Sequence, residues 1–238
     1  MPVKAVLFDM FDTLMLIERN HEFYSPSLMR MYRYLKANGI DVPFNRFNTA
    51  YIAARDRLYA KADLDFGEPH FNVRVSDTLK SLGYNYDVSS PLVAAATNEF
   101  CEEFMTFVSI DTEAEAMLRR LHGRYKLGIV SNFAIPECVF KLLKTAGIDG
   151  LFDVVVVSGA VNKRKPSPEI FKSALKMLGL SASEAVFVGD TIDADIEGAK
   201  AVGMRAIYIE RREQEASKFL PDRTIKNLSE LASVLESV

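Results

Sequence analysis

The segment Val6-Leu7-Phe8-Asp9-Met10-Phe11-Asp12-Thr13-Leu14 joins a short apolar run to a polar cluster that begins with Asp9. Three later apolar runs have the same design and lead to Ser131, to a loop that ends at Lys165, and to Gly189-Asp190. Each run is short, rich in β-branched residues and bounded by polar or glycine residues, which is typical of a strand buried on both faces. We therefore predict buried strands that deliver polar groups at their carboxyl ends.

Helical patterns separate these runs, and a further strand follows them. Strands are expected at 125–131, 152–157, 185–189 and 205–209, and helices at 112–122, 136–146, 167–178 and 193–202. Strands that alternate with helices form parallel sheets, in which ligands bind beyond the carboxyl ends of the strands. The pattern predicts an α/β fold with a doubly wound parallel sheet, a Rossmann-like core, whose polar groups converge at one edge.

The segment between the first strand and the rest of the sheet has a helical pattern. Helix-period stretches cover 27–38, 47–62, 73–82 and 91–104, and the segment contains no convincing run of buried strands. Because the first strand must join strands far later in the chain, we predict an inserted α-helical cap at 16–106. Residues 1–15 and 107–238 form the predicted core, in which 225–238 is one last amphipathic helix.

Composition and charge limit the classes of partner. The 238 residues are 49% hydrophobic, which allows a substantial interior. The net charge is −3, and the 29 basic and 32 acidic residues are spread evenly, without the basic stripe of nucleic-acid binders. We therefore predict a globular protein, either a monomer or a homodimer, that has no nucleic-acid partner.

The N-terminal apolar stretch is short and is broken by Asp9 and Asp12, which fits neither a signal peptide nor a membrane span. This pattern predicts a cytoplasmic protein without membrane contact. The two cysteines, Cys101 and Cys138, lie in different predicted segments, so we expect buried thiols rather than a disulfide framework or a metal cluster.

Two acidic clusters follow buried strands. Asp9 and Asp12 alone fit turn and capping roles as well as a functional role. However, Asp190, Asp193 and Asp195 follow another buried strand, where a single capping aspartate would satisfy the next helix. Carboxylates that face each other across neighbouring strand ends repel unless a hard cation such as Mg²⁺ lies between them. The two clusters together predict a metal site.

The other two clusters suit an anionic substrate. Ser131 and Asn132 can donate hydrogen bonds, and Lys163, Arg164 and Lys165 supply positive charge. An isolated lysine before a proline-started helix is more often a solvated side chain. In combination, a carboxylate, a hydroxyl, a lysine and an acid-held cation are the groups that metal-assisted transfer through a carboxylate nucleophile requires.

These clusters, in this order and spacing, resemble the motifs of the haloacid dehalogenase superfamily of hydrolases. The family's Asp-x-Asp-x-Thr motif is similar to Asp9–Thr13, and its strand ending in Ser or Thr is similar to that of Ser131. Its Lys-Pro motif resembles Lys165-Pro166, and its Gly-Asp-x-x-x-x-Asp motif resembles Gly189–Asp195. The resemblance covers roughly 1–14 and 107–220, and the helical insertion resembles the family's first-position cap.

The resemblance implies a phosphatase that acts on a small phosphorylated metabolite. Asp9 would attack the phosphorus of a phosphate monoester and form an aspartyl-phosphate, which water then hydrolyses. Asp9, the backbone carbonyl of Phe11 and Asp190 would hold the cofactor Mg²⁺, with Asp195 as a supporting metal-site residue.

The resemblance also implies roles for the remaining motif residues. Ser131 and Thr13 would hydrogen-bond the transferring group or the nucleophile, and Lys165 would offset its negative charge. Ser131, Asn132 and Lys165 are therefore the expected substrate-binding residues.

One residue departs from the family's phosphatases. Two positions after the nucleophile they carry a second aspartate, which protonates the leaving alcohol, but here that position is Phe11. A phenyl ring cannot transfer a proton. Asp12 either supplies the missing acid through a shifted loop or braces the loop. Without an acid, we expect activity to favour good leaving groups, such as aryl or acyl phosphates.

Two alternatives follow from this departure. The family's metal-independent 2-haloacid dehalogenases also carry an aromatic residue at the position of Phe11. Asp190 and Asp195 argue against that activity, because a metal-free site for a carboxylate substrate gains nothing from further acids, and Asp12 stands where the dehalogenases are expected to have glycine. The other alternative is a non-catalytic protein that binds Mg²⁺ and phosphate.

The insertion is expected to cover the strand ends and to determine the choice of substrate. Its many aromatic residues fit the interior of a helical bundle better than they fit a substrate pocket. Four basic residues could reach a second anionic group of a substrate or be surface charges balanced by nearby acids: Arg19, Arg55, Arg57 and Arg74.

Overall fold

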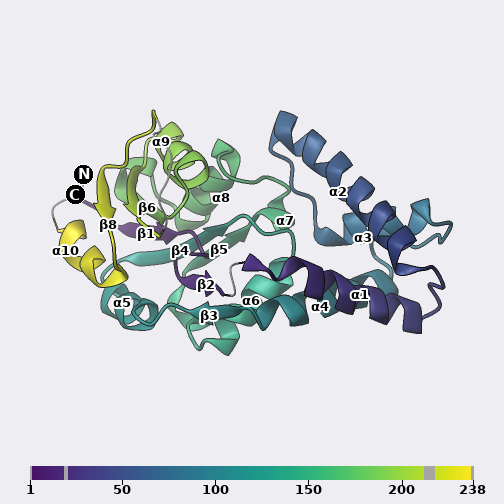
Figure 1. Ribbon diagram of the computed structural model, residues 1–238. Coiled ribbons are helices and arrows are strands. Elements are labelled where there is room, and N and C mark those ends of the chain that lie inside the picture. Colours follow the sequence, from purple (N-terminus) through teal and green to yellow (C-terminus); the bar gives the residue numbers. More distant parts are fainter. Residues whose placement is uncertain (1, 19–20, 212–217, 237–238) are drawn as a thin grey trace.

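A computed structural model describes residues 2–18, 21–211 and 218–236. Six parallel strands form one sheet in the order β5-β4-β1-β6-β7-β8 (Figure 1). In chain order these strands are β1 Ala5–Phe8, β4 Lys126–Ser131, β5 Val154–Val157, β6 Ala185–Gly189, β7 Arg205–Ile209 and β8 Arg223–Ile225. The strand that opens the chain therefore lies inside a sheet built mainly from the second half of the sequence, as predicted.

The register of the central strands brings their polar clusters together. Phe8 of β1 lies beside Ile129 of β4 and beside Val188 of β6. All residues of β1 and β6 are buried, because helices cover both faces of the sheet. The chain leaves these strands at the same edge, which places Asp9 and Asp190 side by side.

Alternate residues of β1 belong to two different hydrophobic clusters. Val6 and Phe8 pack with one cluster, and Ala5 and Leu7 pack with the other. The first cluster includes α5 (Ala114–Leu121), α6 (Pro136–Thr145) and α10 (Leu231–Leu235), and the second includes α8 (Pro168–Leu178) and α9 (Glu197–Ala201). Helices on both faces of a parallel sheet confirm the predicted doubly wound α/β fold.

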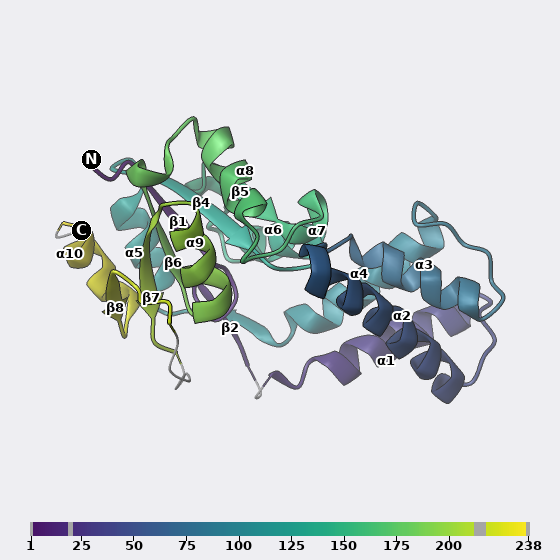
Figure 2. The same ribbon diagram turned by 90° about the horizontal axis from the view of Figure 1, so that it is seen from above.

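Four helices lie between β2 (Met15–Ile17) and β3 (Val108–Ile110), to one side of the sheet (Figures 1 and 2). They are α1 Tyr24–Ala37, α2 Phe44–Asp65, α3 Phe71–Ser81 and α4 Pro91–Met105. Helix α1 packs on α4, and α2 packs on α3. The predicted helices in this segment are thus present. The domain limits at 15/16 and 106/107 stay a prediction.

The remaining elements are short. Strands β2 (Met15–Ile17) and β3 (Val108–Ile110) form an antiparallel pair where the helical insertion leaves and rejoins the core. Helix α7 is Ser158–Val161, 3₁₀ turns cover Asp149–Leu151, Ala182–Glu184 and Leu228–Glu230, and a π-helix covers Ile192–Ile196. The pattern predicted neither β2 nor β3, because a strand of three residues is too short to show a period.

The prediction of one helix over 225–238 was wrong at its start. Ile225 ends β8, where it lies beside Ile209 of β7. Asn227 and Glu230 then form a capping box that begins a 3₁₀ turn, and α10 starts only at Leu231. The end of the predicted helix, 237–238, lies outside the described residues. The capping residues Asn227 and Glu230 therefore determine where the last helical segment begins, and the periodic apolar pattern does not.

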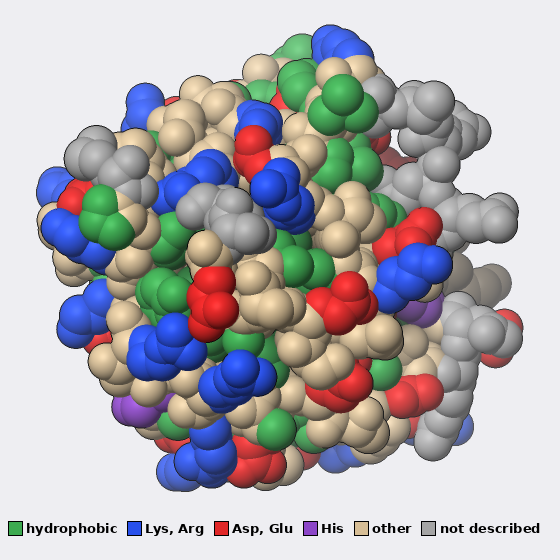
Figure 3. Space-filling model, turned by 90° about the vertical axis from the view of Figure 1, so that its left-hand side faces the viewer, with side chains coloured by type: hydrophobic (Ala, Val, Ile, Leu, Met, Phe, Trp, Pro, Cys, Tyr) green, Lys and Arg blue, Asp and Glu red, His purple; other side chains and the backbone are tan. Residues whose placement is uncertain are grey.

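No helix in the described ranges is long and apolar enough to cross a membrane. Figure 3 shows the end of the core that lies away from the helical insertion. Basic and acidic side chains are interspersed on this face rather than gathered by sign.

The close packing of the central sheet leaves no room for a side chain at Gly128. A methyl group there would lie 2.5 Å from Leu7 Cδ2 and 2.5 Å from Val154 Cγ1. We expect Gly128→Ala to lower the free energy of unfolding by about 1–3 kcal/mol in urea denaturation. Gly150→Ala is the matched control, since no atom lies within 4 Å of its added methyl. Equal losses in the two variants would contradict this account of the sheet.

Candidate active site

The candidate site lies at the carboxyl ends of β1, β4 and β6. Asp9 follows β1, Ser131 ends β4, and Asp190 follows β6. Asp195 comes from the π-helix after β6, and Lys165 comes from the loop between α7 and α8. All five side chains are buried. The structure thus brings together one residue or more from each of the four predicted clusters.

Lys165 is the centre of the charged groups. Its ammonium hydrogen-bonds the Asp9 carboxylate and lies 2.7 Å from Asp195 Oδ1. Burial alone would lower the pKa of Lys165, but the carboxylates of Asp195 and Asp9 raise it above its ordinary value. The lysine is therefore a permanent cation inside the site.

The site contains more negative than positive charge. Carboxylate oxygens of Asp9, Asp190 and Asp195 lie within 4.8 Å of one another. Burial raises the pKa of Asp9 to about 7; Lys165 opposes this shift, and Asp195 and Asp190 add to it. One lysine cannot neutralise three carboxylates. An oxygen-rich cluster with excess negative charge suits a hard divalent cation, so these residues fit the predicted metal.

Asp193, the third acid of the same cluster, is exposed at the surface. Asp195 uses both of its carboxylate oxygens within the protein, since Oδ1 contacts Lys165 and Oδ2 accepts a hydrogen bond of 3.0 Å from the backbone N–H of Thr191. This arrangement suits the supporting role expected of Asp195. Gly189 is required beside it, because an added Cβ would lie 2.4 Å from Asp195 Oδ2.

Two hydroxyl groups in the site have no hydrogen-bond partner. Thr13 Oγ1 and Ser131 Oγ are both buried, and neither is bonded to another group in the described ranges. A buried hydroxyl without a partner is costly, and a bound anion would satisfy it. The family resemblance implied that both residues hydrogen-bond the transferring group or the nucleophile, and this role stays a prediction.

Asn132 holds the lysine loop in place. Its Oδ1 accepts a hydrogen bond of 2.7 Å from the backbone N–H of Lys165, and its Nδ2 donates one of 3.0 Å to the Lys165 carbonyl. The sequence analysis assigned Asn132 to substrate binding, which stays a prediction. The clamp on Lys165 was missed, because it joins two loops that are distant in sequence.

Asp12 braces the loop after β1. It has a left-handed backbone with φ of 59°. Its Oδ1 accepts a hydrogen bond of 3.1 Å from the backbone N–H of Ile17, and its Oδ2 lies 3.3 Å from His21 Nε2. These contacts favour the bracing alternative over the role of a general acid.

Arg211 braces the same loop and was missed by the sequence analysis. Its guanidinium donates hydrogen bonds of 3.1 Å and 3.0 Å to the carbonyls of Asp12 and Thr13, and one of 2.7 Å to Asp111. It follows β7, far from the loop in sequence, and no motif marks it.

Phe11 points its ring at aromatic neighbours from two parts of the chain. The ring centroid lies 5.4 Å from that of Phe104 in α4 and 4.9 Å from that of Phe133, which follows β4. Phe11 therefore links the loop after β1 to the helical insertion. It offers no proton donor to the site.

A cavity of about 440 Å³, here called the cap cavity, lies between the inserted helices and the loops after β4 and α7. The inserted segment contributes Phe23, Tyr24, Tyr59, Glu68, Phe71, Arg74 and Phe100, and the core contributes Asn132, Phe133, Ala134, Ile135 and Arg164. Phe71 N–H donates a hydrogen bond of 2.8 Å to the Ala134 carbonyl, and Arg164 N–H donates one of 2.9 Å to the Phe66 carbonyl. Backbone contacts therefore hold the two sides together.

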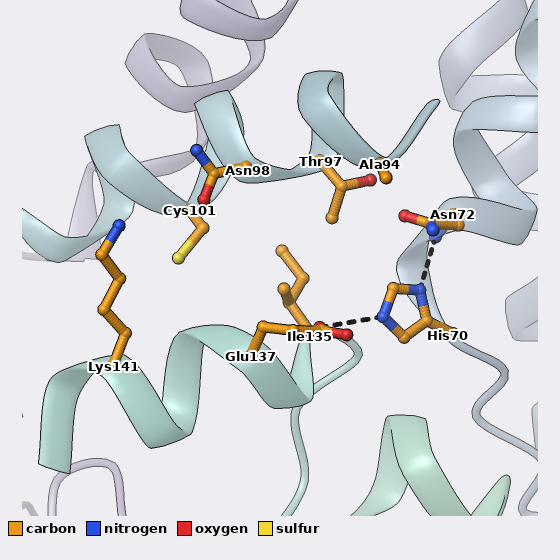
Figure 4. A pocket seen from close by; sticks show the side chains of 9 residues that line it. All are labelled: His70, Asn72, Ala94, Thr97, Asn98, Cys101, Ile135, Glu137 and Lys141. Atoms are coloured by element: carbon orange, nitrogen blue, oxygen red, sulfur yellow. Dashed lines mark hydrogen bonds and ion pairs between the residues drawn. The ribbon is translucent and has the colours of Figure 1, made fainter. Parts of the chain in front are cut away.

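A second, smaller cavity of about 150 Å³ lies between α4, α6 and the start of α3 (Figure 4). His70 Nε2 lies 3.0 Å from Glu137, and its Nδ1 accepts a hydrogen bond of 3.1 Å from the backbone N–H of Asn72. Cys101 faces this cavity, and it and Cys138 are both buried and free, as predicted. The contact of His70 with Glu137 joins the insertion to α6 of the core.

Comparison with known proteins decides the family. The family model for haloacid dehalogenase-like hydrolases matches residues 3–203. The chain belongs to the haloacid dehalogenase-like hydrolases. The family suggested by the four sequence motifs is thereby confirmed, and the chain is a hydrolase of that superfamily.

Several of these hydrolases match nearly the whole chain. The glyceraldehyde 3-phosphate phosphatase of Methanopyrus kandleri is 28% identical, over 99% of this chain and 98% of that protein. A crystal structure of a phosphatase from Thermococcus onnurineus is 28% identical, with a TM-score of 0.65 over 98% of each chain. That of a 2-haloacid dehalogenase from Pseudomonas syringae is 26% identical, with a TM-score of 0.77 over 99% of each chain.

The role of Asp12 as a brace can be measured through stability. Asp12→Ala removes the acceptor for the Ile17 N–H and places alanine in a left-handed conformation, so we expect a loss of about 2–3 kcal/mol in the free energy of unfolding. Asp12→Asn keeps an oxygen and tolerates that conformation, so it should lose less than about 1 kcal/mol. Urea denaturation measures both, and an unchanged stability of Asp12→Ala would contradict the brace.

Proposed function

We propose that this hydrolase is a Mg²⁺-dependent phosphatase, which hydrolyses a small-molecule phosphate monoester through an aspartyl-phosphate on Asp9. The observation that carries the proposal is the buried group of three carboxylates around one lysine, together with two buried hydroxyls that have no hydrogen-bond partner among the described residues. The named activities of the relatives from Methanopyrus kandleri and Thermococcus onnurineus support phosphate esters as the substrate class.

In the proposed reaction, an oxygen of Asp9 forms a bond to phosphorus as the bond to the leaving oxygen breaks. Lys165 orients the Asp9 carboxylate, and Thr13 and Ser131 donate hydrogen bonds to the phosphoryl oxygens. A water molecule then attacks the phosphorus of the aspartyl-phosphate, releases phosphate and regenerates Asp9.

The residues proposed to hold Mg²⁺ are Asp9, Asp190 and the backbone carbonyl of Phe11, with Asp195 in support. When bound, the ion would neutralise the phosphoryl oxygens and let the anionic substrate approach the carboxylates. Asp195 and Asn132 act by fixing Lys165, one through its ammonium and the other through its backbone.

One rival activity has specific support. Phe11 and the similarity to the Pseudomonas syringae enzyme favour a 2-haloacid dehalogenase. However, a 2-haloacid is itself an anion, and a metal-free site in which three carboxylates surround Lys165 would repel it. Phosphatase activity accounts for these acids, and the dehalogenase does not.

The test is release of phosphate from p-nitrophenyl phosphate with Mg²⁺ and with EDTA. We expect turnover that EDTA removes and that Asp9→Asn lowers by at least about a thousand-fold. Asp193→Asn is the matched control, since Asp193 is an exposed acid of the same cluster, and it should leave turnover unchanged.

Other outcomes separate the alternatives. Chloride release from 2-chloropropionate without metal, together with no phosphate release, would contradict the phosphatase and establish the dehalogenase. Binding of Mg²⁺ and phosphate without turnover in either assay would instead favour a non-catalytic protein.

The absence of an acid at Phe11 predicts a dependence on the leaving group. A general acid contributes about 10²–10⁴ to the rate with poor leaving groups. We expect kcat to fall steeply from aryl to alkyl phosphates, and the ratio of the two values to be the same in Asp12→Asn as in the wild type. A fall of about 100-fold in Asp12→Asn that is confined to alkyl phosphates would show that Asp12 is the acid.

A further inference from the structure

The cap cavity contains a buried arginine that no acid of the described ranges neutralises. Arg74 of α3 is only 7% exposed. Within the described part of the chain it forms no ion pair, and its hydrogen bonds come only from Nη1, at 3.4 Å to the Tyr24 hydroxyl and 3.3 Å to the Tyr51 hydroxyl. Its Nε is buried and has no partner there. A buried guanidinium with unused donors is costly unless something else pairs with it.

Aromatic rings hold this guanidinium in one orientation. Its central carbon lies 5.2 Å from the ring centroid of Tyr59, 5.1 Å from that of Phe71 and 5.8 Å from that of Tyr51. Burial raises the pKa of Tyr51 well above its ordinary value, so its hydroxyl stays neutral. The rings and hydroxyls therefore orient the arginine but leave its charge in place.

The unused N–H donors of Arg74 have the geometry that binds a carboxylate. Nη1 is occupied by the two tyrosines, which leaves Nε and Nη2. These two nitrogens carry parallel N–H bonds, and they match the two oxygens of a carboxylate in a bidentate pair.

The cavity as a whole is positively charged. Arg164 also lines it, and no ion pair or hydrogen bond from the Arg164 side chain occurs among the described residues. Glu68 is the one acid among the described lining residues, and its carboxylate accepts a hydrogen bond from the hydroxyl of Ser158. Two guanidinium groups therefore face one carboxylate, and a further anion would balance the charge.

The cap cavity borders the phosphoryl site. Asn132, which clamps Lys165, lines it, and so does Phe133, whose ring packs on Phe11. Its volume of about 440 Å³ is in the range of small-molecule sites. A substrate whose phosphorus faces Asp9 would place its leaving group here.

We propose, on the basis of the proposed phosphatase function, that Arg74 binds a carboxylate of the leaving group, so that the substrate is the phosphate monoester of a small hydroxy acid. Arg74 is a specificity residue in this proposal. Of the four basic residues considered in the sequence, Arg57 is exposed, Arg55 pairs with Asp56, and Arg19 lies outside the described residues. Of these four, Arg74 is the one that lines the cap cavity among the described residues.

The first experiment compares matched substrates of the wild-type chain. We expect kcat/KM for 2-phosphoglycolate to exceed that for ethyl phosphate by at least about 10-fold, and the same for 3-phosphoglycerate over glycerol 3-phosphate. Propane-1,3-diol bisphosphate tests the nature of the second anion. A higher kcat/KM for this bisphosphate than for both carboxylated esters would overturn the proposal. Equal kcat/KM values within each of the two pairs would also overturn it.

The second experiment removes the guanidinium. Arg74→Gln should lose the preference for carboxylated esters mainly through KM, Arg74→Lys should keep part of it, and the exposed control Arg57→Gln should keep all of it. A purely structural arginine would instead lower turnover of all esters alike. If Arg74→Gln does not fold, Arg74→Lys and the wild-type comparison still decide.

Hydrolysis of p-nitrophenyl phosphate distinguishes a failure of the role proposed for Arg74 from a failure of the proposed phosphatase function. Turnover of this ester without any preference for carboxylated substrates contradicts the role of Arg74 alone. Lack of turnover with every phosphate ester contradicts the proposed phosphatase itself, and the assignment of Arg74 with it.

Discussion

The contact of Lys165 with Asp9 and Asp195 is the interaction on which the arrangement of the site depends. Among the described residues of this site, one buried ammonium lies among three buried carboxylates, so negative groups outnumber positive ones there. Such a group is stable only where the backbone fixes each member, because a misplaced charge in a low-dielectric interior is strongly penalised. Much of the local structure serves this purpose. The parallel register aligns the strand ends, Asn132 clamps the lysine backbone, and Gly189 makes room for Asp195.

The aromatic residues connect this charged centre to the helical insertion. Phe11 follows Asp9 by two positions and packs on Phe133 from the core and on Phe104 from α4. Helix α3 of the same insertion contributes Arg74 to the cap cavity, which lies next to the proposed phosphoryl site. In this account the core performs the same chemistry on any substrate, and the insertion selects substrates by the charge of the leaving group. The presence of Phe11 in place of an acid is then consistent with a loop after β1 that packs against the insertion and does not transfer a proton.

Much of the fold and of the site could be predicted from the sequence, because both are encoded by local patterns. The apolar runs before Asp9, Ser131 and Asp190 are long enough to identify buried strands, and parallel topology alone brings their ends together. Strands β2, β3 and β8 could not be predicted, because three residues show no period and depend on a partner strand. The clamp formed by Asn132, the brace formed by Arg211 and the choice of Arg74 among four candidate basic residues could not be predicted either. Each depends on contacts between segments that are distant in sequence, and for Arg74 the decisive fact is which partners are lacking.

The central claim is that a divalent cation completes the charge balance of Asp9, Asp190 and Asp195. Thermal unfolding at increasing MgCl₂ concentration tests it without reference to any substrate, because an ion that binds only the folded chain raises the midpoint of unfolding. The account predicts a saturable rise in the wild type and in Asp193→Asn, and no such rise in Asp190→Asn. A midpoint that does not respond to Mg²⁺ in the wild type, or that rises equally in Asp190→Asn, would contradict it.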